Sequence, residues 1–247
     1  MKKLQREDGA SIAYEHSPGK GPGVVFLCGF KSDMTGEKAL ALEGFCRRRG
    51  QAYLRFDYTG HGASSGAFTD GTIGAWTADT VFVLDELTEG RQILVGSSMG
   101  GWLMVLVALA RPERISGLLG ISSAPDFTEE LIWNGLTAEE RQRLRADGVI
   151  HQPSDYGEEP TPITRALIED GRRHLVLQQP IGLTCPARLL HGMADTDVPW
   201  RGSVTLAEKL AAEDVVVTLI KDAEHRLSRA GDIERIKGAL TELSEMA

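Results

Sequence analysis

The chain has 247 residues, 42% of them hydrophobic and 25% charged, which predicts one globular domain with a sizeable core. This composition excludes extended disorder. The formal net charge of −8 at pH 7 makes nucleic acids and anionic membrane surfaces poor partners, because binding to them depends on clustered Lys and Arg.

The cysteines and the apolar segments indicate a reducing, aqueous compartment. Cys28, Cys46 and Cys185 form a sparse, odd set without a CxxC pair, which argues against a disulfide framework or a zinc site. The longest apolar stretch, residues 102–110, is too short to span a bilayer, so we expect no integral membrane association. No apolar segment follows the N-terminal lysines, as a secretory signal would require. We therefore expect a cytoplasmic, bacterial protein, with a mature mitochondrial matrix form left open.

Short apolar strand patterns alternate with helical patterns along the chain, which predicts a mostly parallel sheet with helices on both faces. The first two strands form a hairpin, residues 4–7 and 12–16, around Asp8 and Gly9. Six further strands are expected at residues 24–27, 52–56, 93–97, 118–122, 187–191 and 215–220. The helices between them are expected at residues 37–48, 72–87, 99–110, 201–212 and 232–245.

One segment, residues 125–185, breaks this alternation. It contains no convincing strand pattern, but two polar helical patterns at residues 137–147 and 162–174, joined by a loop around residues 152–160. An insertion of this size after the sixth strand must lie over an edge of the sheet. At the C-terminal edge it would form a lid that shapes substrate choice.

The strongest functional pattern is Gly96-Ser97-Ser98-Met99-Gly100, which fits G-x-S-x-G. It follows a predicted strand directly and precedes a predicted helix. Small residues on both sides let the chain turn sharply and lift the central serine above the sheet. Ser98 is therefore the candidate nucleophile.

A serine hydroxyl needs a base within hydrogen-bond reach and a carboxylate that orients the base. His225 follows the last predicted strand, and Asp195 follows the strand before it, in the segment HGMADTDVP. These positions predict His225 as the base and Asp195 as the acid. Asp197 lies in the same loop and competes for the acid role. We favour Asp195, which holds the acid position of HGxxDxxVP, and interpret Asp197 as a solvated or turn-stabilising carboxylate.

Two backbone amides are needed to hold the oxyanion of an acyl-transfer intermediate. Met99 begins the helix after Ser98, and Phe30 lies in the loop after the strand at residues 24–27. We predict their N–H groups as the two donors. Cys28, in the same loop, is interpreted as a small packed residue.

The remaining glycine-rich and histidine-containing segments predict no cofactor. The loop of residues 57–66 is interpreted as a tight turn whose Asp and Ser side chains bond to the backbone. The histidine–carboxylate clusters lack metal-ligand spacing. The glycine loops lack both the G-K-[ST] and the G-x-G-x-x-G patterns, so no phosphate or dinucleotide site is expected.

Five segments together resemble one group of α/β-hydrolases, the mitochondrial palmitoyl-protein thioesterase and acyl-glucuronide deacylase of the abhydrolase-domain proteins, with its bacterial relatives. The resemblance covers nearly the whole chain and is weakest in the predicted lid. The segments are CGFKSDMTGEKALALEGFC, LRFDYTGHGASSG, ILVGSSMGGWLM, LLHGMADTDVPW and DAEHR. The resemblance implies an α/β-hydrolase fold with Ser98, Asp195 and His225 as nucleophile, acid and base. It also implies a thioesterase with esterase activity on acyl esters or thioesters, including those of S-acylated proteins.

Alternatives remain open at this point. The same three residues serve in small-molecule carboxylesterases and in carbon–carbon bond hydrolases, and a catalytically silent binding protein can keep the fold. Trp133 and Trp200 are candidates for contact with an acyl chain, with packing inside the lid as the competing interpretation. The sequence does not indicate an oligomeric state.

Overall fold

The computed structural model describes residues 1–153 and 159–246. Part of the loop expected around residues 152–160 therefore lies outside the described residues. The sheet has eight strands in the order β1-β2-β4-β3-β5-β6-β9-β10. Its strands are β1 (Lys2–Gln5), β2 (Ser11–Ser17), β3 (Lys20–Leu27), β4 (Gln51–Phe56), β5 (Gln92–Ser97), β6 (Ile115–Ile121), β9 (Ala187–Gly192) and β10 (Val215–Ile220).

The pairing of these strands confirms the expected mostly parallel sheet. β2 pairs antiparallel with both β1 and β4, and the other neighbouring strands run parallel. Parallel strands in such a sheet are buried on both faces, which explains why β5 and β6 are buried along their whole length.

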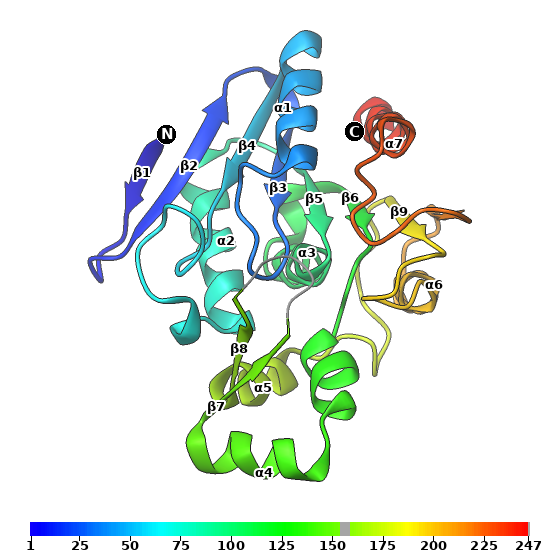
Figure 1. The fold of residues 1–247 in the computed structure, drawn as a ribbon. Coiled ribbons are helices and arrows are strands. Elements are labelled where there is room, and N and C mark those ends of the chain that lie inside the picture. The colour runs from blue at the N-terminus through cyan, green and yellow to red at the C-terminus, as the bar shows by residue number, and fades with distance from the viewer. Residues whose placement is uncertain (154–158, 247) are drawn as a thin grey trace.

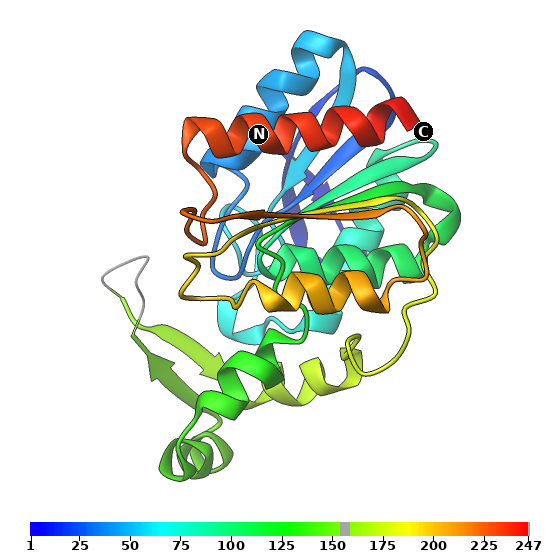
Figure 2. The same cartoon turned by 90° about the vertical axis from the view of Figure 1, so that its right-hand side faces the viewer.

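Helices cover both faces of the sheet (Figures 1 and 2). α1 (Glu37–Arg49) and α7 (Ala230–Met246) lie on one face, and α2 (Ile73–Leu87), α3 (Met99–Ala110) and α6 (Arg201–Lys209) lie on the other. All five expected helices are present. α6 ends three residues earlier than predicted, because Leu210 is extended and bridges to Ile181 instead of continuing the helix.

The insertion after β6 lies beyond the C-terminal ends of the strands, where a lid was expected (Figure 1). It contains a turn of π-helix at Thr128–Trp133, then α4 (Ala138–Asp147), β7 (Val149–Gln152), β8 (Thr161–Thr164) and α5 (Arg165–Gly171). A capping box of Thr137 and Glu140 begins α4, and Gly148 in the left-handed region ends it.

The prediction that this insertion contains no strand is wrong. β7 and β8 pair antiparallel, with Ile150 opposite Ile163, so residues 162–164 of the expected second helix are extended. These strands are four residues each, too short for their alternation to stand out in the sequence. The two isoleucines face a small separate core, completed by Leu136, Leu144 and Ile168.

Two buried carboxylates fix the position of the lid. One joins its two ends, and the other links it to the sheet domain. Asp126 accepts hydrogen bonds from the amides of Val176 and Leu177, both at 2.9 Å, which joins the two ends of the insertion. Asp170 accepts from the amide of Gly74, at the start of α2, at 2.7 Å. Among the described residues, no helix combines the length and the apolar character needed to cross a bilayer.

The loop at residues 57–66 has the structural role predicted for it. Asp57 accepts from the amides of Met34 and Ala63 at 2.7 and 2.8 Å, and the hydroxyl of Ser64 donates to the carbonyl of Asp57. Gly62 has a positive φ, and a Cβ there would lie 2.2 Å from the Asp57 carboxylate. The loop is thus closed around its own aspartate.

Candidate active site

Ser98 occupies the sharp turn between β5 and α3. Its φ of 54° and ψ of −118° are strained for a residue with a side chain. The surrounding backbone fixes this conformation: the Ser98 amide donates to the carbonyl of Ile121, and the Ser98 carbonyl accepts from the amides of Gly101 and Ala124. The half-buried side chain opens into a cavity.

Glycines beside Ser98 are required by close backbone packing. A Cβ on Gly96 would lie 2.2 Å from the carbonyl oxygen of Gly100, and one on Gly100 would lie 2.2 Å from that of Leu27. Neither contact is possible for a real side chain. The sequence pattern that predicted the turn is therefore a direct consequence of its geometry.

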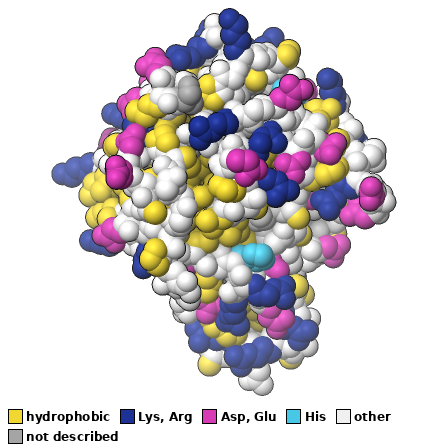
Figure 3. Space-filling model, turned by 180° about the vertical axis from the view of Figure 1, so that it is seen from behind, with side chains coloured by type: hydrophobic (Ala, Val, Ile, Leu, Met, Phe, Trp, Pro, Cys, Tyr) yellow, Lys and Arg dark blue, Asp and Glu magenta, His cyan; other side chains and the backbone are white. Residues whose placement is uncertain are grey.

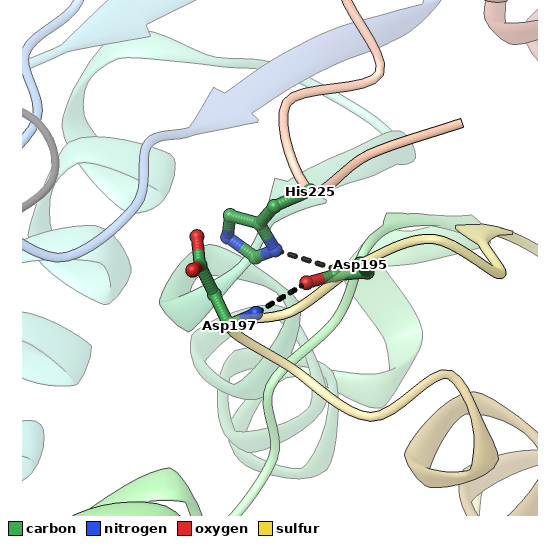
Figure 4. Close-up of side chains that lie close together, drawn as sticks. All are labelled: Asp195, Asp197 and His225. Carbon is green, nitrogen blue, oxygen red and sulfur yellow. Dashed lines mark hydrogen bonds and ion pairs between the residues drawn. The ribbon is translucent and has the colours of Figure 1, made fainter. Parts of the chain in front are cut away.

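His225 follows β10 and contacts Ser98 directly. Its Nε2 lies 3.1 Å from Ser98 Oγ, and its Nδ1 lies 2.7 Å from Asp195 Oδ2 (Figure 4). An ionised carboxylate only accepts hydrogen bonds, so Nδ1 carries the proton and Nε2 has a lone pair for the serine hydroxyl. The His225 side chain is 16% exposed, which leaves it accessible from the cavity.

Asp195 follows β9 and is fully buried. Its Oδ2 accepts from His225 Nδ1 and from His191 Nε2, the latter at 3.0 Å. Its Oδ1 accepts from the amides of Asp197 and Val198, at 2.9 and 2.8 Å. Burial alone would raise the pKa of this carboxyl. The hydrogen bonds from His191, His225 and Val198 outweigh burial and hold the pKa of Asp195 well below its ordinary value.

His191 is a further residue of this network, beyond the three that the sequence predicted. It is fully buried at the end of β9. Its Nδ1 lies 2.7 Å from Ser203 Oγ, so the second ring nitrogen can donate to Asp195. The chain of contacts therefore runs from Ser203 through His191, Asp195 and His225 to Ser98.

The two predicted oxyanion donors lie next to Ser98. Met99 is the first residue of α3, so its amide has no acceptor within the helix. Phe30 lines the same cavity, and a Cβ on the preceding Gly29 would lie 3.4 Å from the Ser98 Cβ. The Phe30 ring packs against Phe68 and Phe127 at centroid distances of 5.0 and 5.4 Å, which anchors the loop.

Cys28 has the packed role that was predicted. It is buried, and burial, with the charge of Asp57 nearby, raises the pKa of its thiol far above the ordinary value. A thiol that stays protonated is a poor nucleophile. Ser98 is therefore the better candidate in this part of the molecule.

The cavity that contains Ser98 has a volume of about 1050 Å³. Its lining combines apolar side chains, several of them from the lid, with polar and charged side chains from the loop before α1, the lid and the loop around His225. The apolar lining residues include Phe30, Met99, Phe127, Leu131, Ile132 and Ile163. No sequence pattern indicated the lid residues in this set. Leu131 and Ile132 come from a π-helical turn, Phe127 from the residue before it, and Ile163 from a four-residue strand.

Trp133 and Trp200, predicted as contacts for an acyl chain, are not among the described residues that line this cavity. The guanidinium groups of Arg172, Arg141 and Arg145 stack on the Trp133 ring, at 4.4, 5.1 and 5.3 Å from its centroid. Dark blue side chains gather over the lid, in the lower part of Figure 3, and the lid sequence contains arginine but no lysine. Trp200 stacks with Arg201 at the start of α6. Trp133 therefore packs within the lid, whereas Trp200 lies outside it, and contact of either ring with an acyl chain stays a prediction.

Comparison with known proteins shows the family to which this chain belongs. Residues 38–167 match the family described as alpha/beta hydrolase fold. The mitochondrial palmitoyl-protein thioesterase ABHD10 of Bos taurus is 42% identical over 241 residues, which are 97% of this chain and 78% of the relative. The Homo sapiens protein of the same name is 41% identical over the same shares.

Two solved structures agree over almost the whole chain. Alpha/beta hydrolase domain-containing protein 10 from mouse has a TM-score of 0.91 and 39% identity, covering 99% of this chain and 98% of that one. A protein of Agrobacterium vitis S4, described as a hydrolase, has a TM-score of 0.93 and 42% identity, covering 99% and 97%. The likeness includes the lid, where the sequence resemblance was weakest.

Proposed function

Because this chain belongs to the α/β-hydrolase family, we propose that it is a serine hydrolase that cleaves acyl thioester and ester bonds through Ser98, His225 and Asp195. The observation that carries the proposal is the line of hydrogen bonds from Ser98 Oγ through His225 to buried Asp195, at 3.1 and 2.7 Å. This line opens into a cavity whose lining includes apolar residues that suit an acyl chain.

The first half-reaction transfers the acyl group to the enzyme. Ser98 Oγ attacks the acyl carbonyl as His225 Nε2 takes the hydroxyl proton, and the amides of Phe30 and Met99 hold the oxyanion. His225 then gives the proton to the leaving sulfur or oxygen, and the bond between that atom and the carbonyl carbon breaks. The products are a Ser98 acyl ester and a free thiol or alcohol.

The second half-reaction repeats these steps with water. His225 takes a proton from water, whose oxygen attacks the Ser98 ester, and returns the proton to Ser98 Oγ as the acid leaves. Asp195 stays ionised throughout, because its four hydrogen bonds favour the charged form. It keeps Nδ1 protonated and thereby keeps Nε2 available for both transfers.

We assign long-chain acyl thioesters, including those on S-acylated proteins, as the substrate class. The apolar residues that the lid contributes to the cavity support a long acyl chain, and the relatives named palmitoyl-protein thioesterases support a thioester. The same relatives favour an enzyme over a silent binding protein. The cytoplasmic location expected from the sequence stays a prediction, since the named relatives are mitochondrial.

The test is hydrolysis of p-nitrophenyl esters and acyl thioesters with chains from two to sixteen carbons, by the wild-type protein and by Ser98→Ala. We expect activity that rises with chain length, favours thioesters and is lost in the variant. A preference for short esters would indicate a small-molecule carboxylesterase. Equal rates in both proteins would contradict the proposed role of Ser98.

A further inference from the structure

Asp197 brings a second carboxylate to the histidine of the proposed site. Its backbone amide donates to Asp195 Oδ1, so its main chain belongs to the turn that holds the acid. Its half-buried side chain lines the cavity beside His225. One oxygen from each carboxylate and one ring nitrogen of His225 all lie within 4.8 Å of one another.

Figure 4 shows which edge of the imidazole this carboxylate faces. His225 Nδ1 points to Asp195, and the carboxylate of Asp197 lies beside the opposite edge, which carries Nε2. Nε2 is also the atom that contacts Ser98 Oγ. Asp197 therefore lies next to the nitrogen that takes and returns the proton. This position differs from the solvated or turn-stabilising role that the sequence suggested for its side chain.

We propose, on the basis of the function proposed above, that Asp197 is a positioning residue whose carboxylate stabilises the protonated ring of His225. Each half-reaction passes through this cationic ring: the proton moves from Ser98 Oγ to Nε2 and on to the leaving atom, and later from water to Nε2 and back to Ser98 Oγ. A nearby negative charge favours the cation, and partial burial reduces screening by solvent.

Other charged groups face the same cavity, and their effects on the pH profile must be distinguished from the effect of Asp197. Lys38 reaches from α1 to donate to the carbonyl of Arg226, the residue after His225. Burial and the charge of Arg226 lower the pKa of Lys38 to about 8, so it titrates on the basic side of a pH profile. The other charged residues that line the cavity are Lys31, Asp33, Glu37, Glu159 and Arg226. All of these residues are the same in the wild-type protein and in the Asp197 variants, so a difference in the acid limb between them reports on Asp197.

The experiment is the pH dependence of kcat/KM for one acyl thioester in the wild-type protein and in Asp197→Asn. Without the negative charge the ring loses its proton more easily, so the midpoint of the acid limb should move about half to one pH unit lower. The plateau of kcat should fall about 10-fold with little change in KM, because the cationic ring forms only as the reaction proceeds.

Two further variants serve as controls. Asp197→Glu keeps the charge and should restore the wild-type midpoint. Asp222→Asn removes the same charge three residues before His225, but from a side chain that is 80% exposed and bonded to Arg229, so its midpoint should match the wild type.

A wild-type midpoint in Asp197→Asn would overturn this inference, whatever its plateau rate. If thermal unfolding shows that Asp197→Asn does not fold, Asp197→Ser takes its place. A wild-type midpoint in Asp197→Ser would then overturn the inference in the same way. Ser98→Ala in the same series separates the two proposals. An inactive Ser98→Ala together with an unshifted Asp197→Asn removes only the role of Asp197, whereas a fully active Ser98→Ala removes the proposed function as well.

Discussion

The sheet domain carries Ser98, and the lid covers it. Each region is stabilised internally by a different kind of contact. In the sheet domain, buried parallel strands end in loops whose side chains are fixed by hydrogen bonds from fully buried groups, as at Asp195. The lid has a core of five buried residues and covers Trp133 with exposed or half-buried arginines.

This difference separates two tasks of the molecule. Acyl transfer needs atoms held within a few tenths of an ångström, and buried hydrogen bonds between rigid elements give that precision. The lid contributes mainly apolar side chains to the cavity, which select a substrate by shape and hydrophobic contact and tolerate looser packing. We therefore expect changes in the sheet domain to affect rate or folding, and changes in the lid to affect substrate preference.

The largest effect is expected at Asp195. Asp195→Asn keeps the shape but lets the wrong tautomer of His225 form, so kcat should fall by about 10⁴-fold with KM nearly unchanged. Steady-state kinetics on one thioester checks this, with circular dichroism to show that the fold persists. A loss below 10-fold would indicate that Asp195 does not orient His225.

A pair of glycines compares the two regions directly. A Cβ at Gly100 meets the backbone oxygen of Leu27 at 2.2 Å, whereas at Gly135, in the lid, nothing lies within 4 Å. Gly100→Ala should lower the free energy of unfolding by about 3 kcal/mol or prevent folding, and Gly135→Ala should change it by less than about 0.5 kcal/mol. Chemical denaturation measures both, and similar values for the two would contradict the proposed difference in packing.

Histidines in the two regions should differ in their effect on how the free energy of unfolding depends on pH. His61 is 3% exposed among the rings of Tyr58, Phe68 and Trp76, and burial lowers its pKa to about 4. The unfolded chain therefore binds a proton first as pH falls. The free energy of unfolding therefore falls by about 3 kcal/mol in total as pH drops from about 6.5 to about 4, and it is unaffected by His61 above that range.

Unfolding free energies measured over this pH range should show that dependence in the wild type and a weaker one in His61→Phe. His151→Phe, at an exposed position on β7 in the lid, is the matched control and should keep the wild-type dependence. An unchanged slope in His61→Phe would show that His61 is not held neutral.

The smallest effect is expected in the lid. Ile132 lines the cavity, so Ile132→Ala should reduce kcat/KM for long acyl chains about 10-fold while leaving short chains nearly unaffected, because it removes apolar contact and not a reacting group. Trp133→Leu changes the neighbouring residue, which lies outside the cavity lining, and should keep the wild-type order of chain lengths. A changed order in Trp133→Leu would restore Trp133 as a substrate contact.

The two regions also differ in how far the sequence predicts them. The parallel strands are apolar runs between turn residues, so their positions along the chain can be read from local patterns. Close backbone packing leaves glycine as the residue that fits at Gly96 and Gly100, so the turn at Ser98 can be read in the same way. The contact of His225 with Asp195 follows from the strand ends that place both residues on the same edge of the sheet.

The features that sequence analysis missed depend on tertiary contacts. β7 and β8 are stable because Ile150 and Ile163 share a core with residues of α4 and α5, which no four-residue window shows. The direction of the Asp197 side chain is set by the turn in which its amide binds Asp195. The position of Trp133 depends on arginines from two different segments.

The most direct test of the account is to trap the acyl-enzyme and locate the acyl group. The wild-type protein is mixed with a long-chain acyl thioester, quenched in acid during turnover and mapped by peptide mass spectrometry. Cys185→Ala is included because Cys185 is half-buried, unlike Cys28 and Cys46, and could accept the acyl group by exchange. We predict an acyl adduct on Ser98 in the wild type and in Cys185→Ala, and none in Ser98→Ala. Turnover with no adduct on Ser98, or an adduct on Cys185 alone, would contradict the account.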